Sequence, residues 1–354
     1  MEKPITAAML SCEGYELTDR EKYLFSKSNP LGITLFSRNI KDNVQVKKLV
    51  EDIKNTINRD DVLIAVDEEG GRVSRLKELR GYSYLDQETL TNFPTKYSKI
   101  QATLISDELN NLGININYSP VVDKKDACQS KVLENRCFDG DDKKIISYAK
   151  ALADTYIKMG VCPCIKHIPG HFSTSNDPHL DVIESNISID EIEKQIIYLK
   201  AFSNYPLAMT SHIKLNKIDA INPTTISKKV VTKIIRNTIG FNGFLLSDAI
   251  NMHAINGNLL DKIKSALGAG LDAVCYCAGK YNEMYEICNN NLFMSEKALI
   301  RFANIKKVIN NKKNAVDIDT LRASYLKDMK EYLNKEYSYD ATEVLHQMQK
   351  KGDF

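Results

Sequence analysis

The sequence lacks the features that mark membrane and secreted proteins. No apolar run in the 354 residues approaches the roughly eighteen residues that a membrane-spanning helix needs. The start of the chain has no basic segment followed by a long apolar one. The whole chain also has no low-complexity tract, so it can bury a large core. We therefore expect an unsecreted, cytoplasmic protein with no membrane partner.

An excess of charge of one sign is also missing. The 48 lysines and arginines nearly balance the 46 aspartates and glutamates, which leaves a net charge of +2. The lysines are scattered among acids, as is typical of ordinary solvated faces. We therefore expect no nucleic-acid partner.

Sequence motifs for structural zinc, thiol redox chemistry and dinucleotides are absent. None of the eight cysteines forms a C-x-x-C motif, so a zinc ribbon or a thioredoxin-like site has no support. Cys162 with Cys164 and Cys275 with Cys277 lie inside apolar runs, which indicates reduced core thiols. No G-x-G-x-x-G follows an early strand, which argues against an open dinucleotide-binding sheet.

Eight short apolar or β-branched runs recur along the chain, and helix-patterned stretches separate most of them. This alternation predicts parallel strands with helical crossovers. Eight such units favour a closed (β/α)₈ barrel of the TIM type, an α/β fold, over an open doubly wound sheet. The expected strands are 5–10, 32–36, 62–66, 114–122, 161–165, 207–210, 243–246 and 273–276. The expected helices include 43–57, 99–112, 143–159, 189–202, 227–239 and 259–267.

Charged, helix-patterned segments follow the eighth run, at 295–313, 319–335 and 341–351. We expect them to be outer helices packed on the barrel, and a partner-binding tail is the alternative. The predicted organisation is a catalytic barrel over residues 1–290 with C-terminal helices over 291–354. We expect a monomer.

Polar residues come directly after six of the apolar runs. In a barrel all of them would converge on the C-terminal rim, where such folds place their chemistry. Any one could be an ordinary cap or turn residue, but six together indicate an active site. These residues are Arg38, Asp67, Asp123, Lys166 with His167, Ser211 with His212, and Asp248.

One stretch concentrates ionisable groups after the fifth run. Lys166-His167-Ile-Pro-Gly-His171 leads into small, polar residues that end in Asp177-Pro178-His179, so three of the six histidines lie within thirteen residues. The intervening residues predict a mobile loop. In an extended backbone residues i and i+2 share a side, so the Asp177 carboxylate can reach the His179 imidazole. Such a pair would make a proton-transfer unit.

A metal site is the alternative interpretation of this stretch. Residues 169 and 170 are proline and glycine, which make a zincin-like helix between the first two histidines improbable. We therefore expect no metal and no cofactor. The side chains of a suitable ligand type are His167, His171, Asp177, His179 and Asp181.

Asp248 follows the apolar run 243–247, and burying an unpaired charge there would be costly. A structural aspartate would need a fixed partner, whereas a nucleophile would attack a sugar anomeric carbon while a second group protonates the leaving oxygen. After the third run, Gly70 and Gly71 allow a sharp turn. Asp67 and Arg75, on either side, could bind sugar hydroxyls.

Together these runs resemble the glycoside hydrolase family 3 β-N-acetylhexosaminidases of the bacterial cytosolic type. The family pattern Lys-His-Phe-Pro-Gly-His followed by Asp-Ser-His corresponds to Lys166 through His171 and Asp177 through His179. The similarity runs from about Met9 to Val274. Other matching stretches are 13–17, 35–39, 67–73, 117–123, 136–138, 240–243 and 247–249.

The resemblance implies a (β/α)₈ enzyme of peptidoglycan recycling that removes N-acetylglucosamine from anhydro-muropeptides in the cytosol. It implies that Asp248 is the nucleophile and that His179, paired with Asp177, is the acid/base. It also implies that the terminal N-acetylglucosamine is bound by Asp67, Arg75, Arg136, Lys166 and His167.

The sequence departs from the family pattern at a few positions. Phe172 and Ser173 stand where the pattern usually has Gly and Asp, Pro178 replaces the serine of Asp-Ser-His, and Cys137 stands where Ser is usual. Phe172 could stiffen the loop or narrow the site. These changes bear on loop mobility and peptide tolerance more than on the reaction.

The sequence is compatible with four functions, led by a retaining exo-β-N-acetylglucosaminidase. In a second, the substrate's acetamido group attacks while Glu68 and Glu69 assist. A third is a phosphorylase, because a histidine acid/base repels phosphate less than a carboxylate does. The last is a non-catalytic sugar-binding barrel.

Overall fold

A computed structural model describes residues 3–125, 133–171, 183–252, 255–311, 317–333, 335 and 337. Its main sheet is entirely parallel, with the strand order β7-β6-β3-β2-β1-β13-β12-β10-β8. The strands are β1 (Thr6–Ser11), β2 (Pro30–Leu35), β3 (Leu63–Val66), β6 (Ile116–Asn117), β7 (Cys162–Pro163), β8 (Ile165–Ile168), β10 (Leu207–Thr210), β12 (Phe244–Ala249) and β13 (Ala273–Cys275).

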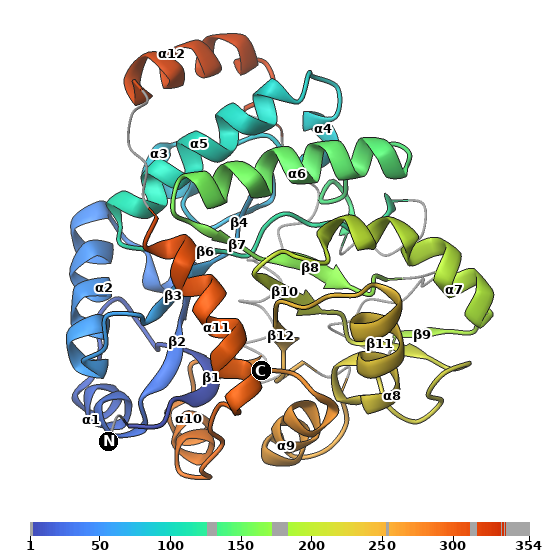
Figure 1. Cartoon of the computed structure of the whole chain (residues 1–354). Helices are drawn as coiled ribbons and strands as arrows, with labels where there is room; N and C mark the ends of the chain where they lie inside the picture. Colours follow the sequence, from blue (N-terminus) through green and yellow to red (C-terminus); the bar gives the residue numbers. More distant parts are fainter. Residues whose placement is uncertain are drawn as a thin grey trace.

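The sheet closes on itself into a barrel (Figure 1). The outermost strands of the order, β7 and β8, are two parts of one strand that is interrupted only at Cys164. If β7 and β8 are counted as one strand, the barrel has eight strands. Each strand then lies beside the strand that precedes it in the chain. The predicted (β/α)₈ barrel is confirmed, and each of the eight predicted runs contains or overlaps a strand.

Helices surround this barrel, and each of the six predicted helix ranges contains or overlaps a helix. Helix α2 (Asn43–Ile57) buries Val46 and Ile53 on one face. It starts at Asp42, whose carboxylate accepts a hydrogen bond from the Gln45 amide, and it stops at a left-handed Asn58. Further helices around the barrel are α1 (Asp19–Ser28), α5 (Lys96–Asn111), α6 (Asp142–Lys158), α9 (Leu259–Ala269) and α10 (Tyr281–Cys288), with short turns at α3 (Lys77–Arg80) and α4 (Gln87–Leu90).

Two predicted helices change their type of turn. Helix α7 (Ile189–Ile196) continues as a 3₁₀ helix over Ile197–Phe202, and α8 (Lys228–Val230) continues as a π-helix over Val231–Thr238. The apolar spacing marks the buried face of these segments, but it does not specify which backbone groups form the hydrogen bonds.

The barrel strands bury both of their faces. In β1, Ala7 and Met9 point into the barrel, whereas Ala8 and Leu10 pack outward against the helices. Helix α11 (Glu296–Ile309) adds Phe302 to the inner cluster and closes the N-terminal end of the barrel (Figure 1). The C-terminal rim is the end that carries the predicted polar residues.

The C-terminal segment contributes a second helix, α12 (Ile318–Met329), which packs against α5 outside the barrel (Figure 1). Predicted helix 341–351 lies outside the described residues. The division into 1–290 and 291–354 remains a prediction. Among the described residues, no helix combines the length and the apolar character needed to span a membrane.

Candidate active site

The structure brings the polar residues at the strand ends together on one rim. Asp67 directly follows β3, Lys166 and His167 lie in β8, and Asp248 lies near the end of β12. The Lys166 Nζ atom is 2.8 Å from Asp67 Oδ1, and His167 Nε2 is 3.8 Å from Asp248 Oδ2. Groups from three separate strands therefore share a single site.

Asp248 is held as a partly accessible carboxylate. Its side chain is 25% exposed, and the Ala249 amide donates to Oδ1 over 2.7 Å. Burial would raise the pKa of this carboxyl group, but the neighbouring imidazoles of His167 and His212 lower it to about 2. Asp248 is therefore ionised at neutral pH, as a nucleophile must be.

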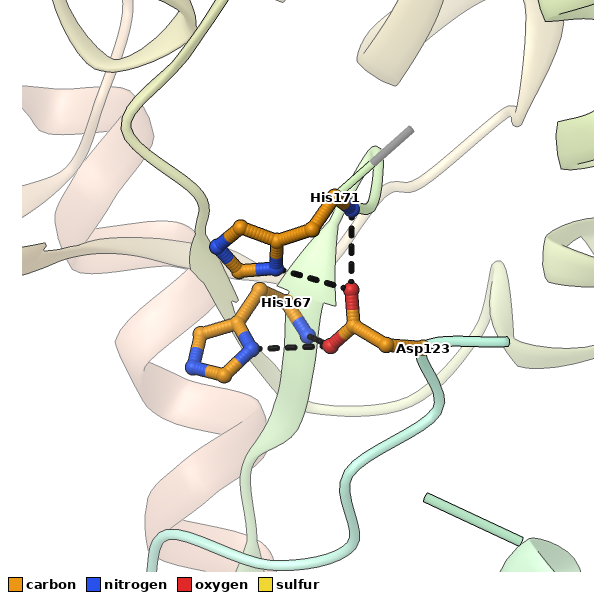
Figure 2. Close-up of side chains that lie close together, drawn as sticks. All are labelled: Asp123, His167 and His171. Atoms are coloured by element: carbon orange, nitrogen blue, oxygen red, sulfur yellow. Dashed lines mark hydrogen bonds and ion pairs between the residues drawn. The ribbon is translucent and has the colours of Figure 1, made fainter. Parts of the chain in front are cut away.

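The Asp123 carboxylate organises two histidines (Figure 2). Its Oδ2 accepts from the backbone amide and Nδ1 of His167 at 3.0 and 2.8 Å, and its Oδ1 accepts from the amide and Nδ1 of His171, both at 3.0 Å. Burial would raise the pKa of Asp123, but His171 and His167 hold it well below its usual value. An ionised carboxylate only accepts hydrogen bonds, so both Nδ1 atoms carry protons.

These three side chains also meet the distance requirement of a metal site. Their ligand-type atoms lie within 4.8 Å of one another. Both Nδ1 atoms and both carboxylate oxygens are engaged in the four hydrogen bonds, so a metal bound through Nδ1 would have to displace its proton. The prediction that the reaction needs no metal stays a prediction.

A compact charged cluster lies beside this group. Lys166 Nζ contacts Glu69 Oε1 at 2.6 Å as well as Asp67, and Arg136 makes a bidentate pair with Glu69 at 2.8 and 2.9 Å. Arg75 Nη2 lies 3.7 Å from Asp67 Oδ2. Burial would lower the pKa of Lys166, but Asp67 and Glu69 raise it, so the amine stays charged. Four of the predicted substrate-binding residues therefore form one network.

Glu69 is a component of this cluster for which the sequence predicts no binding role. It is 2% exposed, and Arg136 and Lys166 lower its pKa although burial opposes this. Asp67 and Glu69 are two residues apart at the start of β4 (Glu68–Gly70), so strand alternation places them on the same side. That alternation was the available signal.

The other strand-end candidates hold backbone segments near the site. His212 is buried, with Nδ1 2.7 Å from Thr225 Oγ1 and Nε2 3.0 Å from the Ala249 carbonyl, directly after Asp248. Ser211 donates to the Gly170 carbonyl, and Arg38 donates to the carbonyls of residues 12 and 277. These contacts fix the loops around the rim.

The predicted acid/base pair, Asp177 and His179, lies outside the described residues, as do Phe172, Ser173 and Pro178. The catalytic role of the pair therefore stays a prediction. The described part of the rim supplies a nucleophile candidate and a cluster suited to polar sugar hydroxyls.

Comparisons with known proteins find relatives that match most of this chain. The model of the glycosyl hydrolase family 3 N-terminal domain matches residues 7–322. A beta-hexosaminidase from Psychromonas ingrahamii is 30% identical over 76% of this chain and 82% of its own, and one from Haemophilus influenzae is 27% identical over 86% and 91%. The structure of NagZ from Neisseria gonorrhoeae in complex with N-trifluoroacetyl-D-glucosamine has 25% identity and a TM-score of 0.78, covering 93% of this chain and 97% of that one.

Proposed function

Because the chain belongs to glycosyl hydrolase family 3 as a β-N-acetylhexosaminidase, we propose that it is a retaining exo-β-N-acetylglucosaminidase that works through a covalent intermediate on Asp248. The observation that carries this proposal is the ionised, partly accessible Asp248 carboxylate on the same rim as the cluster around Lys166. A carboxylate placed beside a polar sugar subsite can attack the anomeric carbon and form a glycosyl ester.

The terminal sugar binds in the network around Asp67 and Lys166. Asp67 keeps a side chain that is 16% exposed, and its oxygens can accept hydrogen bonds from sugar hydroxyls. Lys166 and Arg136 can donate to sugar oxygens, and His167 presents Nε2 towards the nucleophile. Since the cluster is already ordered by ion pairs, the sugar meets preorganised partners.

His179 protonates the leaving oxygen and later activates the water that cleaves the glycosyl ester, with Asp177 orienting its ring. This assignment rests on the family resemblance and on the i, i+2 spacing of the two residues. The natural substrate is N-acetylglucosamine linked to 1,6-anhydro-N-acetylmuramic acid, with or without a peptide stem. The enzyme thus serves peptidoglycan recycling in the cytoplasm. This substrate follows from the resemblance to the cytosolic type of the family.

The test is turnover of an aryl N-acetyl-β-glucosaminide and the matching aryl β-glucoside, each with and without phosphate, followed by NMR. We expect preference for the acetamido sugar, release of the β-anomer first, and no sugar 1-phosphate. Release of the α-anomer first would contradict retention, and phosphate-dependent formation of sugar 1-phosphate would identify a phosphorylase. Cleavage of the anhydro-disaccharide with and without its peptide tests the natural substrate separately.

A further inference from the structure

Strand β4 pairs antiparallel with β5 (Val73–Ser74) to form a hairpin that starts next to Asp67. Besides Asp67 and Glu69, this hairpin has a third acid that faces the other way. Glu68 lies between them in the chain and is fully buried. Its Oε1 accepts from Ser74 Oγ at 2.6 Å and from Arg80 Nη2 at 2.7 Å, and its Oε2 accepts from the Leu76 amide at 2.9 Å. Glu68 thus links the strand that carries Glu69, on the side facing away from the proposed sugar subsite, to Arg80.

This attachment continues as a chain of alternating charges to the C-terminal helix α12. Arg80 Nη1 donates to Glu108 Oε2 over 2.7 Å, and Glu108 Oε1 accepts from Arg322 Nη1 over 2.6 Å and from the Tyr84 hydroxyl over 2.7 Å. The Arg80 guanidinium also lies over the Tyr84 ring, 4.4 Å from its centroid. Arg322 Nη2 also lies 3.6 Å from Asp107 Oδ2, so the connected charges are three acids and two arginines. Removing Arg322 increases the excess of negative charge in this largely buried row.

A second contact from α12 supports the turn of the same hairpin. The Tyr325 hydroxyl donates to Gln101 Oε1 over 2.6 Å, and Gln101 Nε2 donates to the Leu85 carbonyl over 2.9 Å. A Cβ atom built on Gly70 would lie 2.2 Å from that carbonyl oxygen, so the hairpin backbone rests directly on it. Any shift of Leu85 would therefore be transmitted to residue 70.

The residues after α12 reach the neighbouring position of the turn. Lys335 Nζ and the Tyr337 hydroxyl contact Asp86 Oδ2 at 3.1 and 2.7 Å. A Cβ atom on Gly71 would lie 2.5 Å from Asp86 Cβ and 3.0 Å from the Tyr337 hydroxyl. The C-terminal segment thus packs behind both glycines of the turn.

We propose that Arg322 and Tyr325 are positioning residues of the sugar subsite, so that α12 is part of the binding machinery and not only outer packing. This inference rests on the proposed function, because Asp67 is proposed to hold the sugar and Glu69 holds two other proposed sugar ligands, Lys166 and Arg136. Arg322 acts through Glu108, Arg80 and Glu68, and it touches no substrate.

The test compares Arg322→Met with Arg301→Met. Arg301 is a matched control because it lies on α11 at the opposite end of the barrel, donates to Asp272 Oδ1 over 2.7 Å, and is 24% exposed where Arg322 is 26% exposed. For the aryl N-acetylglucosaminide we expect Arg322→Met to raise KM by about 10-fold with little change in kcat, since uniform sugar binding is weakened. Isothermal titration with free N-acetylglucosamine should show the same loss of affinity. Arg301→Met should lower Tm but leave both values within about twofold of the wild type.

Amide hydrogen exchange tests the positioning role without relying on the proposed activity. Amides of residues 67–76 should exchange faster in Arg322→Met than in the wild type or in Arg301→Met. Tyr325→Phe removes one hydroxyl and should show the same pattern more weakly, and it serves if Arg322→Met does not fold. Unchanged exchange of the hairpin, or equal changes in KM for the two arginine variants, would overturn the positioning role. A wild type that cleaves no N-acetylglucosaminide but shows the exchange effect would overturn the proposed function alone.

Discussion

The Nε2 atom of His167 lies 3.8 Å from Oδ2 of Asp248, on the side of the imidazole opposite the Asp123 carboxylate. This separation is too long for a direct hydrogen bond, so neither atom uses the hydrogen-bonding capacity of the other. The two residues come from β8 and β12, with only β10 between those strands. Burial lowers the pKa of His167, although Asp123 opposes this, so the imidazole is neutral at neutral pH. With its Nδ1 proton pointing to Asp123, the ring presents an acceptor at Nε2. A sugar hydroxyl can therefore donate to His167 beside the nucleophile.

Replacing the nucleophile should abolish turnover without unfolding the protein. Asp248→Asn keeps the size of the side chain, but the amide cannot form the glycosyl ester, so kcat should fall by about 10⁴-fold or more. Steady-state assays with the aryl N-acetylglucosaminide measure this, and circular dichroism checks the fold. Activity within tenfold of the wild type would remove Asp248 from the nucleophile role.

Asp123 should matter for activity because it orients His167. Asp123→Asn turns one acceptor oxygen into an NH₂ group that faces a histidine N–H, and we expect kcat/KM to fall about 10- to 100-fold. The unpaired buried donors should lower the free energy of unfolding by about 1–3 kcal/mol.

Asp272→Asn is the matched control for this variant. Asp272 is buried at the opposite end of the barrel and accepts from Arg236, Arg301 and the Leu245 amide. The Asp272→Asn variant should be less stable in urea unfolding yet retain the kcat/KM of the wild type. If both variants keep full activity, the orienting role of Asp123 is wrong.

The barrel could be predicted because its strands are buried on both faces and read as continuous apolar runs. The predicted run 114–122 is an instructive exception. Regular pairing there is limited to β6 (Ile116–Asn117), and a single bridge joins Val121 to Lys166. Pro120 lies between the two pairings and has no N–H to donate, so the ladder is interrupted where the hydrophobic pattern continues.

The site was less predictable, because its contacts join residues that are far apart in the sequence. The alternation of Asp67 and Glu69 can be read locally, but Arg136 binds Glu69 from 67 residues away. Arg322 reaches Glu108 across 214 residues. Charge patterns identify such residues only as ordinary solvated lysines, arginines and acids. The fold decides which of them become buried partners.

Acid should weaken the protein partly through Asp248. Its folded-state pKa of about 2 is below the usual value of 3.8, so its contribution is complete above pH 4 and is lost as the pH falls towards 2. The shift corresponds to roughly 2 kcal/mol. Urea unfolding from pH 2 to 6 measures the free energy of unfolding of the wild type and of Asp248→Asn. The difference, wild type minus variant, should rise with pH and then level off. Asp123 titrates in both proteins and cancels in this difference. A difference that stays constant or falls with pH would contradict the assigned pKa.

His179 and Asp248 should contribute to different chemical steps, His179 as the general acid and base and Asp248 as the nucleophile. His179→Ala should reduce cleavage of the natural disaccharide by about 10²- to 10⁴-fold, the usual range for loss of a general acid. An aryl leaving group of low pKa needs little protonation, so glycosylation of Asp248 should remain fast in this variant. Hydrolysis of the ester still needs a base to activate water, and the glycosyl-enzyme should accumulate.

Stopped-flow mixing of His179→Ala with the aryl substrate should therefore show a burst of phenol close to one equivalent of enzyme, followed by slow turnover. The nucleophile variant Asp248→Asn should show no burst, because it cannot form the ester. Added azide should speed the slow phase in His179→Ala, since an anionic nucleophile needs no general base. If both variants lose activity without a burst, or if His179→Ala cleaves the natural disaccharide at the wild-type rate, the acid/base must be another residue of the rim.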